Sequence, residues 1–147
     1  MLRVRQATKQ DHSALREIYL KSRAQYFTWM DSSKLAPEDF DRDTEGELVL
    51  VATNGARIIG FVAVWIPDHF IHHLYVHPDY TGQQVGTKLL QTCYETFDAS
   101  PPLTLKCIKE NAKALRFYRS QGWHIKGDGV SSNGAYYLME YGGIHRT

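Results

Sequence analysis

The segment LTLKCIKENAKALRFYRSQGW, from Leu103 to Trp123, changes its period partway along and thereby decides the fold class. Its first six residues largely alternate apolar and polar side chains, which is typical of a β-strand. Asn111 can cap the helix that the following stretch predicts, and Gly122 can end it. A strand followed at once by a helix indicates an α/β protein.

The stretch HPDYTGQQVG, from His77 to Gly86, lies between another strand and another helix. The strand HFIHHLYV precedes it, and Pro78 should stop that strand. Free N–H groups and the helix dipole both favour an anion at a helix N-terminus, so this stretch is a candidate phosphate-binding loop. An ordinary glycine-containing turn is the alternative. The helix after it is predicted by apolar residues at helical spacing: Val85, Leu89, Leu90, Cys93 and Phe97.

The N-terminal half predicts a strand, a helix and a hairpin. Residues 2–7, LRVRQA, alternate as a half-buried strand, and Thr8 with Asp11 resembles a capping box that opens a helix. Residues 29–47 favour a short helix and loops. Residues 47–65 indicate two strands joined across Asn54-Gly55, the commonest short hairpin signal.

Two further strands, WHIKG and AYYLMEY, complete the sheet, with turns expected at Gly127, Gly129 and Gly134. The full order is strand, helices, three strands, helix, strand, helix and two strands. This order predicts a mixed α/β sheet in a single domain spanning residues 1–147. A chain of 147 residues is long enough to bury most of its apolar surface.

Charge and composition argue against nucleic-acid and membrane partners. The 17 Lys and Arg residues and 16 Asp and Glu residues leave a net charge of +1, too little to hold nucleic acid or an anionic membrane. No apolar run approaches the roughly 20 residues that cross a bilayer. Cys93 and Cys107 lack CxxC spacing, and MLRVRQATKQ lacks the apolar core of a signal peptide. A cytoplasmic protein with free, buried thiols is therefore expected.

The chain resembles the GNAT superfamily of acetyl-CoA-dependent N-acyltransferases over nearly its whole length. The resemblance implies a mostly antiparallel central sheet with helices on both faces. It also implies direct transfer of acetyl from acetyl-CoA, the acyl-donor substrate, to a primary amine of a small-molecule or peptide-like acceptor. The alternatives are a non-catalytic acyl-CoA-binding domain that regulates a protein partner and an interaction domain with no coenzyme. The matching residues in the second half are Asn111, Ala114, Phe117, Tyr118, Gly122 and Trp123.

In the resembling family, a loop of pattern Arg/Gln-x-x-Gly-x-Gly/Ala takes the coenzyme A pyrophosphate on its backbone amides. The pattern falls on Thr81, Gln84 and Gly86, and only Gly86 matches it. The side chain at Gln84 restricts the backbone and could hinder the ligand unless it points outward. The coenzyme-binding residues that the resemblance implies are Leu74, Tyr75, Val76, Thr81, Gly82, Gln83, Gln84, Val85, Gly86, Thr87, Asn111 and Tyr118.

Acyl transfer to an amine needs one group that accepts a proton and one that donates it. The resemblance implies that Tyr118 protonates the departing thiolate; a core aromatic is the alternative role. His72 corresponds to a strand histidine that relays the substrate proton in the arylalkylamine branch of the family, and an imidazole suits that task. A half-buried histidine with a structural hydrogen bond, or an ordered water in place of a base, is the other interpretation.

Four histidines lie between His69 and His77. Strand alternation predicts that His72 shares a face with Leu74, while His69, His73 and His77 share the other face. We therefore expect no metal site, since the histidines do not converge and neither cysteine partners nor HExxH spacing is present.

The acceptor site is expected in the first third of the chain. Tyr26, Phe27 and Trp29 could wall an apolar slot, and the stretch PEDFDRDTEGE carries six acids against Arg42. An acidic rim would attract a cationic amine, whereas a solvated loop is the alternative. The resemblance allows a homodimer and does not choose among antibiotics, polyamines, amino acids and proteins as acceptors.

Overall fold

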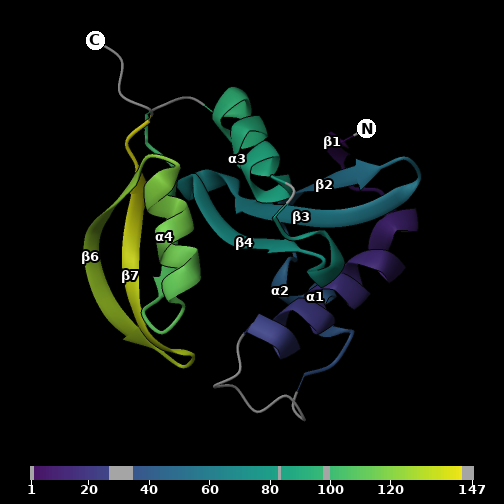
Figure 1. The fold of residues 1–147 in the computed structure, drawn as a ribbon, viewed down its shortest axis with the longest axis horizontal. Helices are drawn as coiled ribbons and strands as arrows, with labels where there is room; N and C mark the ends of the chain where they lie inside the picture. Colours follow the sequence, from purple (N-terminus) through teal and green to yellow (C-terminus); the bar gives the residue numbers. More distant parts are fainter. Residues whose placement is uncertain (1, 27–34, 83, 98–99, 144–147) are drawn as a thin grey trace.

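The computed structural model describes residues 2–26, 35–82, 84–97 and 100–143 (Figure 1). Short 3-10 turns lie at Lys9–Asp11, Ile66–Asp68 and Pro78–Tyr80. The strands are β1 (Leu2–Gln6), β2 (Leu48–Asn54), β3 (Arg57–Trp65), β4 (Phe70–Val76), β5 (Thr104–Ile108), β6 (Trp123–Ser131) and β7 (Gly134–Tyr141). The helices are α1 (His12–Tyr26), α2 (Asp39–Asp43), α3 (Val85–Thr96) and α4 (Ala112–Ser120).

Within the described ranges, the strands form one seven-stranded sheet in the order β1-β2-β3-β4-β5-β7-β6. Neighbouring strands run antiparallel except β4 and β5, which are parallel. The predicted order of elements and the mixed, mostly antiparallel sheet are confirmed. The parallel pair at the centre needs a long crossover, and α3 supplies it.

Helices cover both faces of the sheet, as expected (Figure 1). On one face, α3 buries Leu89, Leu90 and Cys93 against β2, β3 and β4, and α4 packs beside it. On the other face, α1 and α2 form a second cluster with β2 and β3, in which Tyr19 and Phe40 are buried. Among the described helices, none has the length and apolar character needed to cross a membrane.

The entry to α1 follows the predicted capping box. The Asp11 carboxylate accepts hydrogen bonds from the Thr8 backbone N–H (2.7 Å) and from both terminal nitrogens of Arg5 (2.7 and 2.9 Å). These bonds to the charged form, that from Arg5 above all, hold the pKa of Asp11 at about 2. The Asp11 carboxylate therefore links β1 to the start of α1 and stays ionised at neutral pH.

Two details of the turns differ from the prediction. The hairpin between β2 and β3 turns on Gly55 and Ala56, while Asn54 still pairs with Arg57. Gly127 and Gly129 lie inside β6 and not in turns. A Cβ on Gly129 would lie 2.6 Å from the Tyr136 hydroxyl oxygen, so a side chain at this position would displace the Tyr136 ring from the neighbouring strand.

Candidate active site

The sheet splits open between β4 and β5. The two strands pair only at Phe70 with Thr104 and at Ile71 with Leu105 in the described structure. Beyond those pairs, β4 continues along β3 and β5 continues along β7, so the two strands diverge. A cavity of about 780 Å³ lies at this split, which is within the usual size of a small-molecule site.

The cavity collects most of the site residues predicted from the sequence. Gln83 lies outside the described residues, so its predicted contact stays a prediction. The cavity wall also includes Lys106, Cys107, Lys113, Phe117 and Gln121, to which the sequence analysis gave no role in binding. The predicted residues that line it are His72, Leu74, Tyr75, Val76, Thr81, Gly82, Gln84, Val85, Gly86, Thr87, Asn111 and Tyr118.

The N-terminus of α3 presents free backbone donors to this cavity. Gln84 is the N-cap residue and has the left-handed conformation, with φ of 63° and ψ of 24°, and its side chain makes no capping hydrogen bond. The hydrogen bond from the Lys88 N–H to the Gln84 carbonyl (3.0 Å) opens the helix. The N–H groups of Val85, Gly86 and Thr87 therefore have no partner within the helix and can bind an anion.

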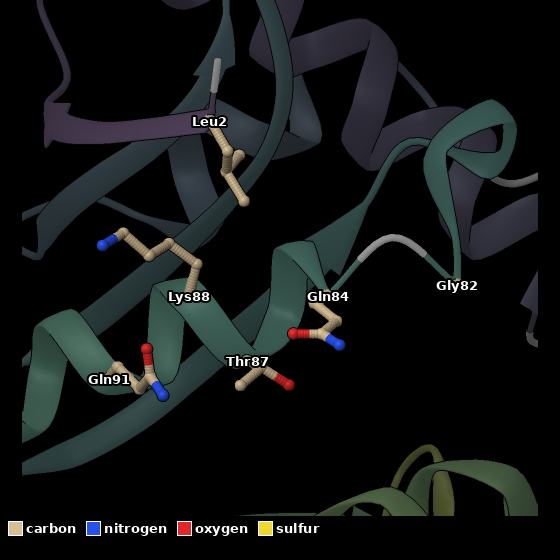
Figure 2. Close-up of a pocket in the computed structure, with 6 residues that line it drawn as sticks. All are labelled: Leu2, Gly82, Gln84, Thr87, Lys88 and Gln91. Carbon is tan, nitrogen blue, oxygen red and sulfur yellow. The ribbon is translucent and has the colours of Figure 1, made fainter.

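A smaller hollow of about 360 Å³ flanks the same helix start (Figure 2). Figure 2 shows the side chains of Gln84 and Thr87 on one side of α3, and that of Lys88 on the opposite side, where Leu2 lies. Gln84 and Thr87 line both this hollow and the larger cavity. The exposed Gln84 side chain thus borders the free N–H groups without capping them.

Gly86 lets the first turn of α3 approach α4. A Cβ built on Gly86 would lie 3.2 Å from Cζ of Phe117 and 3.9 Å from Cγ2 of Val76. Because the helix start and α4 face each other across the cavity, a side chain at this position must displace the Phe117 ring or enter the cavity.

Tyr118 stands on the α4 wall of the cavity with its ring against Phe117 and Trp123, at centroid distances of 5.4 and 6.0 Å. Its hydroxyl has no hydrogen-bond partner among the residues that the structure describes. Burial, followed by the neighbouring Cys107 and Tyr75, raises the pKa of Tyr118, so the hydroxyl keeps its proton at neutral pH.

The two cysteines are free and buried, as predicted. Burial raises the pKa of Cys93 to about 12 and that of Cys107 to about 11. Neither thiol is therefore a thiolate at neutral pH, which leaves both unsuited to act as nucleophiles.

A β-bulge in β4 corrects the predicted facing of the histidines. His73 pairs with Ala63 and Ile71 pairs with Val64, so His72 is an extra residue between them. The imidazoles of His72 and His73 consequently lie on the same side, with centroids 4.1 Å apart. The prediction that they face opposite sides is wrong, because an inserted residue breaks the alternation of a strand.

His72 is held by a buried carboxylate. Its Nδ1 lies 2.8 Å from Oε2 of Glu47, and the side chain of Glu47 is 4% exposed while that of His72 is 48% exposed. A carboxylate can only accept, so Nδ1 is the donor of this hydrogen bond, and in the neutral imidazole Nε2 then keeps its lone pair. Glu47 lies 25 residues before His72, and no local pattern in the sequence links the two.

The other three histidines have structural partners. Nε2 of His73 donates to the Asp43 carbonyl oxygen (3.2 Å), and burial, followed by the neighbouring His72, lowers the pKa of His73 to about 4. His69 lies 2.7 Å from the Pro101 carbonyl oxygen, and His77 accepts from the Asp79 N–H. His72 is therefore the exposed member of the group that lines the cavity with a free ring nitrogen.

Arginine partners neutralise much of the acidic stretch. Arg23 binds Asp39 at 3.2 Å, Arg16 binds Asp41, and Arg42 binds Asp43 at 3.0 Å. These pairs argue for a structural role of the three carboxylates and weaken the hypothesis of an acidic rim.

The predicted apolar slot falls largely outside the described residues. Phe27 and Trp29 are among the residues that the structure leaves undescribed, and Tyr26 is the last residue of α1. The slot at these three positions stays a prediction.

Comparison with known proteins agrees with this geometry. The model of the acetyltransferase (GNAT) family matches residues 12–123. The peptidyl-lysine N-acetyltransferase YiaC of Escherichia coli K12 is 25% identical over 130 residues, which cover 83% of each chain.

Two solved structures share the fold. The apo form of YjaB from Escherichia coli superposes with a TM-score of 0.81 at 21% identity, covering 98% of this chain and 99% of that one. The PaiA N-acetyltransferase of Thermoplasma acidophilum, solved with coenzyme A, gives a TM-score of 0.78 at 18% identity, covering 96% and 98%. The split sheet beside a free helix N-terminus, together with the family match, defines an acyltransferase. The chain belongs to the GNAT family and is an acetyl-CoA-dependent acyltransferase.

Proposed function

We propose that this chain is a one-domain N-acetyltransferase that moves acetyl directly from acetyl-CoA to a primary amine of a small-molecule or peptide-like acceptor. The observation that carries the proposal is the cavity at the β4–β5 split. A candidate proton acceptor, His72, and a candidate proton donor, Tyr118, line the same cavity from different elements.

The residues around the cavity fit acetyl-CoA as the acyl donor. The free N–H groups of Val85, Gly86 and Thr87 suit its pyrophosphate. Oδ1 of Asn111 accepts from the Ala114 N–H (3.1 Å) as the cap of α4, which leaves the amide NH2 of Asn111 to donate toward the cavity. Strand residues Leu74 to Val76 border the split, where alternate N–H groups of β4 face away from β3.

Bound acetyl-CoA supplies a thioester carbonyl, on which the acceptor amine forms the new C–N bond as the C–S bond breaks. A lysine-like amine has a pKa near ~10 and must lose a proton before it attacks. Nε2 of His72 accepts that proton, directly or through one water, and Glu47 holds the imidazole in the required tautomer. Tyr118 donates its hydroxyl proton to the departing sulfur.

A peptide-like lysine is the acceptor that we place first among the candidates. The support is the similarity to YiaC, which is a peptidyl-lysine N-acetyltransferase. Of the six acids in the acidic stretch, Glu47 is the one that contacts His72, which lines the cavity.

An acetyl-CoA thermal-shift measurement followed by a thiol-release assay tests the proposed function. The amine panel should contain lysine peptides, free amino acids, polyamines and aminoglycosides. We expect stabilisation by acetyl-CoA and acceptor-dependent release of free thiol. Binding without turnover across the panel would favour a regulatory acyl-CoA-binding domain, and an absence of binding would overturn the proposal.

Substitutions at Gln84 and Gly86 test the phosphate-binding loop. Gln84→Gly removes the steric strain of a left-handed residue that carries a side chain, which favours the folded loop by about 1 kcal/mol. It also gives the unfolded chain more conformational freedom, which opposes folding by about 1 kcal/mol. We therefore expect a change in acetyl-CoA affinity below about tenfold, or roughly 1.4 kcal/mol. Gly86→Val should weaken binding by more than about tenfold, because the branched side chain meets Phe117.

Calorimetric titration with acetyl-CoA measures both affinities once circular dichroism shows each variant folded. Gly55→Ala is a matched control, because a Cβ on Gly55 meets no atom within 4 Å. It imposes a left-handed residue on the hairpin between β2 and β3, which lines neither hollow, and should leave acetyl-CoA affinity unchanged. If Gln84→Gly abolished binding while Gly86→Val preserved it, the pyrophosphate would have to bind elsewhere.

A further inference from the structure

A cluster of metal-ligating groups lies on the α2 side of β4, where the bulge brings two histidines together. One ligand atom from each of Glu47, His72 and His73 lies within 4.8 Å of the other two. Tetrahedral Zn²⁺ with bonds of about 2.1 Å holds its ligand atoms about 3.4 Å apart. The ligand atoms of this cluster would therefore have to move closer together by at most about 1.4 Å to bind the ion. We propose that Glu47, His72 and His73 bind one divalent transition-metal ion such as Zn²⁺, and that the bound ion inhibits the enzyme.

The buried carboxylate provides the first independent support. Oε1 of Glu47 has no hydrogen-bond partner within the described structure, and the side chain is 4% exposed. Buried carboxylate oxygens normally have partners, and an orphaned one calls for an explanation. A cation beside Oε2 and His72 would compensate the charge of this carboxylate at the point where the protein leaves it unsatisfied.

The imidazole of His73 is already prepared as a ligand. Nε2 of His73 donates to the Asp43 carbonyl oxygen, so Nδ1 of His73 keeps its lone pair. That bond to a backbone carbonyl is the outer contact that metal-ligating histidines commonly make.

The ion would enter at His72. Its Nδ1 and Oε2 of Glu47, 2.8 Å apart, share one proton that the ion would replace. The half-exposed ring gives access from solvent and leaves further coordination positions to water. Two nitrogen ligands and one carboxylate oxygen favour Zn²⁺, Co²⁺, Ni²⁺ or Cu²⁺ over Mg²⁺ and Ca²⁺.

Inhibition follows from competition for one side chain, and this part rests on the proposed function. A neutral His72 imidazole bound to the ion through Nδ1 carries its proton on Nε2, so Nε2 no longer has the lone pair that would accept the proton of the acceptor amine. The ion inhibits the enzyme by occupying His72, and it takes no part in acyl transfer itself.

Direct metal titration separates the site from the activity. Calorimetry with Zn²⁺ and the visible absorption of added Co²⁺ are followed on the parent chain in the absence of acetyl-CoA. We expect one ion per chain, with no comparable signal from Mg²⁺. Glu47→Gln and His73→Gln should each weaken binding by roughly tenfold or more, since even outer-contact changes at metal sites cost 10–100-fold.

His124→Gln is the matched control. His124 is an exposed histidine beside a carboxylate, with Nε2 3.6 Å from Oε1 of Glu140, but it lies on β6, away from the cluster. Its replacement should change Zn²⁺ affinity by less than about twofold. Because His73 is buried, thermal melting checks that His73→Gln folds; His72→Gln, at an exposed position, should lose binding by the same factor.

Equal Zn²⁺ and Co²⁺ binding by the parent, Glu47→Gln and His72→Gln would overturn the metal site. If the ion binds as expected and acetyl transfer continues at the parent rate, the inhibitory role is wrong and so is the proton-accepting role of His72. If no acceptor supports turnover, the titrations still decide whether the site exists.

Discussion

Tyr118→Phe should lower the rate of acetyl transfer by about 10²-fold or more, equivalent to roughly 2.7 kcal/mol, while acetyl-CoA still binds. The substitution keeps the ring that packs against Phe117 and Trp123 and removes only the hydroxyl. That hydroxyl keeps its proton at neutral pH and makes no hydrogen bond to the described residues, so it can face a ligand in the cavity. Loss of the proton donor should therefore affect turnover and not binding.

Single-turnover kinetics with the best acceptor measure the chemical step, and calorimetry measures acetyl-CoA affinity. Tyr94→Phe is the control, because the Tyr94 hydroxyl accepts from Nε1 of Trp123 (2.8 Å) outside the cavity wall. That change should lower stability by about 1 kcal/mol and leave the rate within a few-fold. Equal single-turnover rates for the parent and Tyr118→Phe would remove Tyr118 from the mechanism.

The order of elements was predictable because each element carries its own local signal. The period of two along β1, the helical spacing from Val85 to Phe97 and the cap at Asn111 all depend on neighbours in sequence. Even the position of the coenzyme cavity could be expected, since the family resemblance implied coenzyme contacts at Leu74 to Val76, which line it.

Features that depend on pairing between distant segments were not predictable. The bulge at His72 arises from its register against β3, and a strand pattern read alone cannot reveal an extra residue. Glu47 reaches His72 across 25 residues. The arginines that neutralise Asp39 and Asp41 lie on α1, so the local sequence overstates the unpaired negative charge of the acidic stretch.

Gln84 shows how a departure from a family pattern can preserve its geometry. The pattern calls for glycine, and the structure gives Gln84 the left-handed backbone that glycine adopts readily. The free N–H groups at the start of α3 follow from that backbone and not from the side chain. Comparison with the pattern shows only that the glycine is missing. The structure shows that Gln84 keeps the left-handed backbone conformation expected of that glycine.

His72→Gln should lower kcat/KM by about 10²-fold and remove the ionisation that limits the parent on the acid side of its pH–rate profile. A base must be deprotonated to act, so the rate of the parent rises with pH until the imidazole has lost its proton. Glutamine fills similar space and can form a hydrogen bond, but it cannot take up a proton near neutrality. The rate of the variant should therefore depend on pH only through the acceptor amine.

The pair of His72→Gln and Glu47→Gln separates a proton acceptor from a residue that positions it. Glu47→Gln keeps the imidazole and weakens its anchor, so the rate should fall less while the acid-side ionisation remains. His124→Gln, which removes an exposed histidine beside Glu140, should match the parent in both rate and profile. The measurement is kcat/KM from pH 5 to 9 in metal-free buffer with chelator, because an ion on Glu47 and His72 would mimic either substitution. An acid limb that survives in His72→Gln would assign the proton to water or to another residue of the cavity.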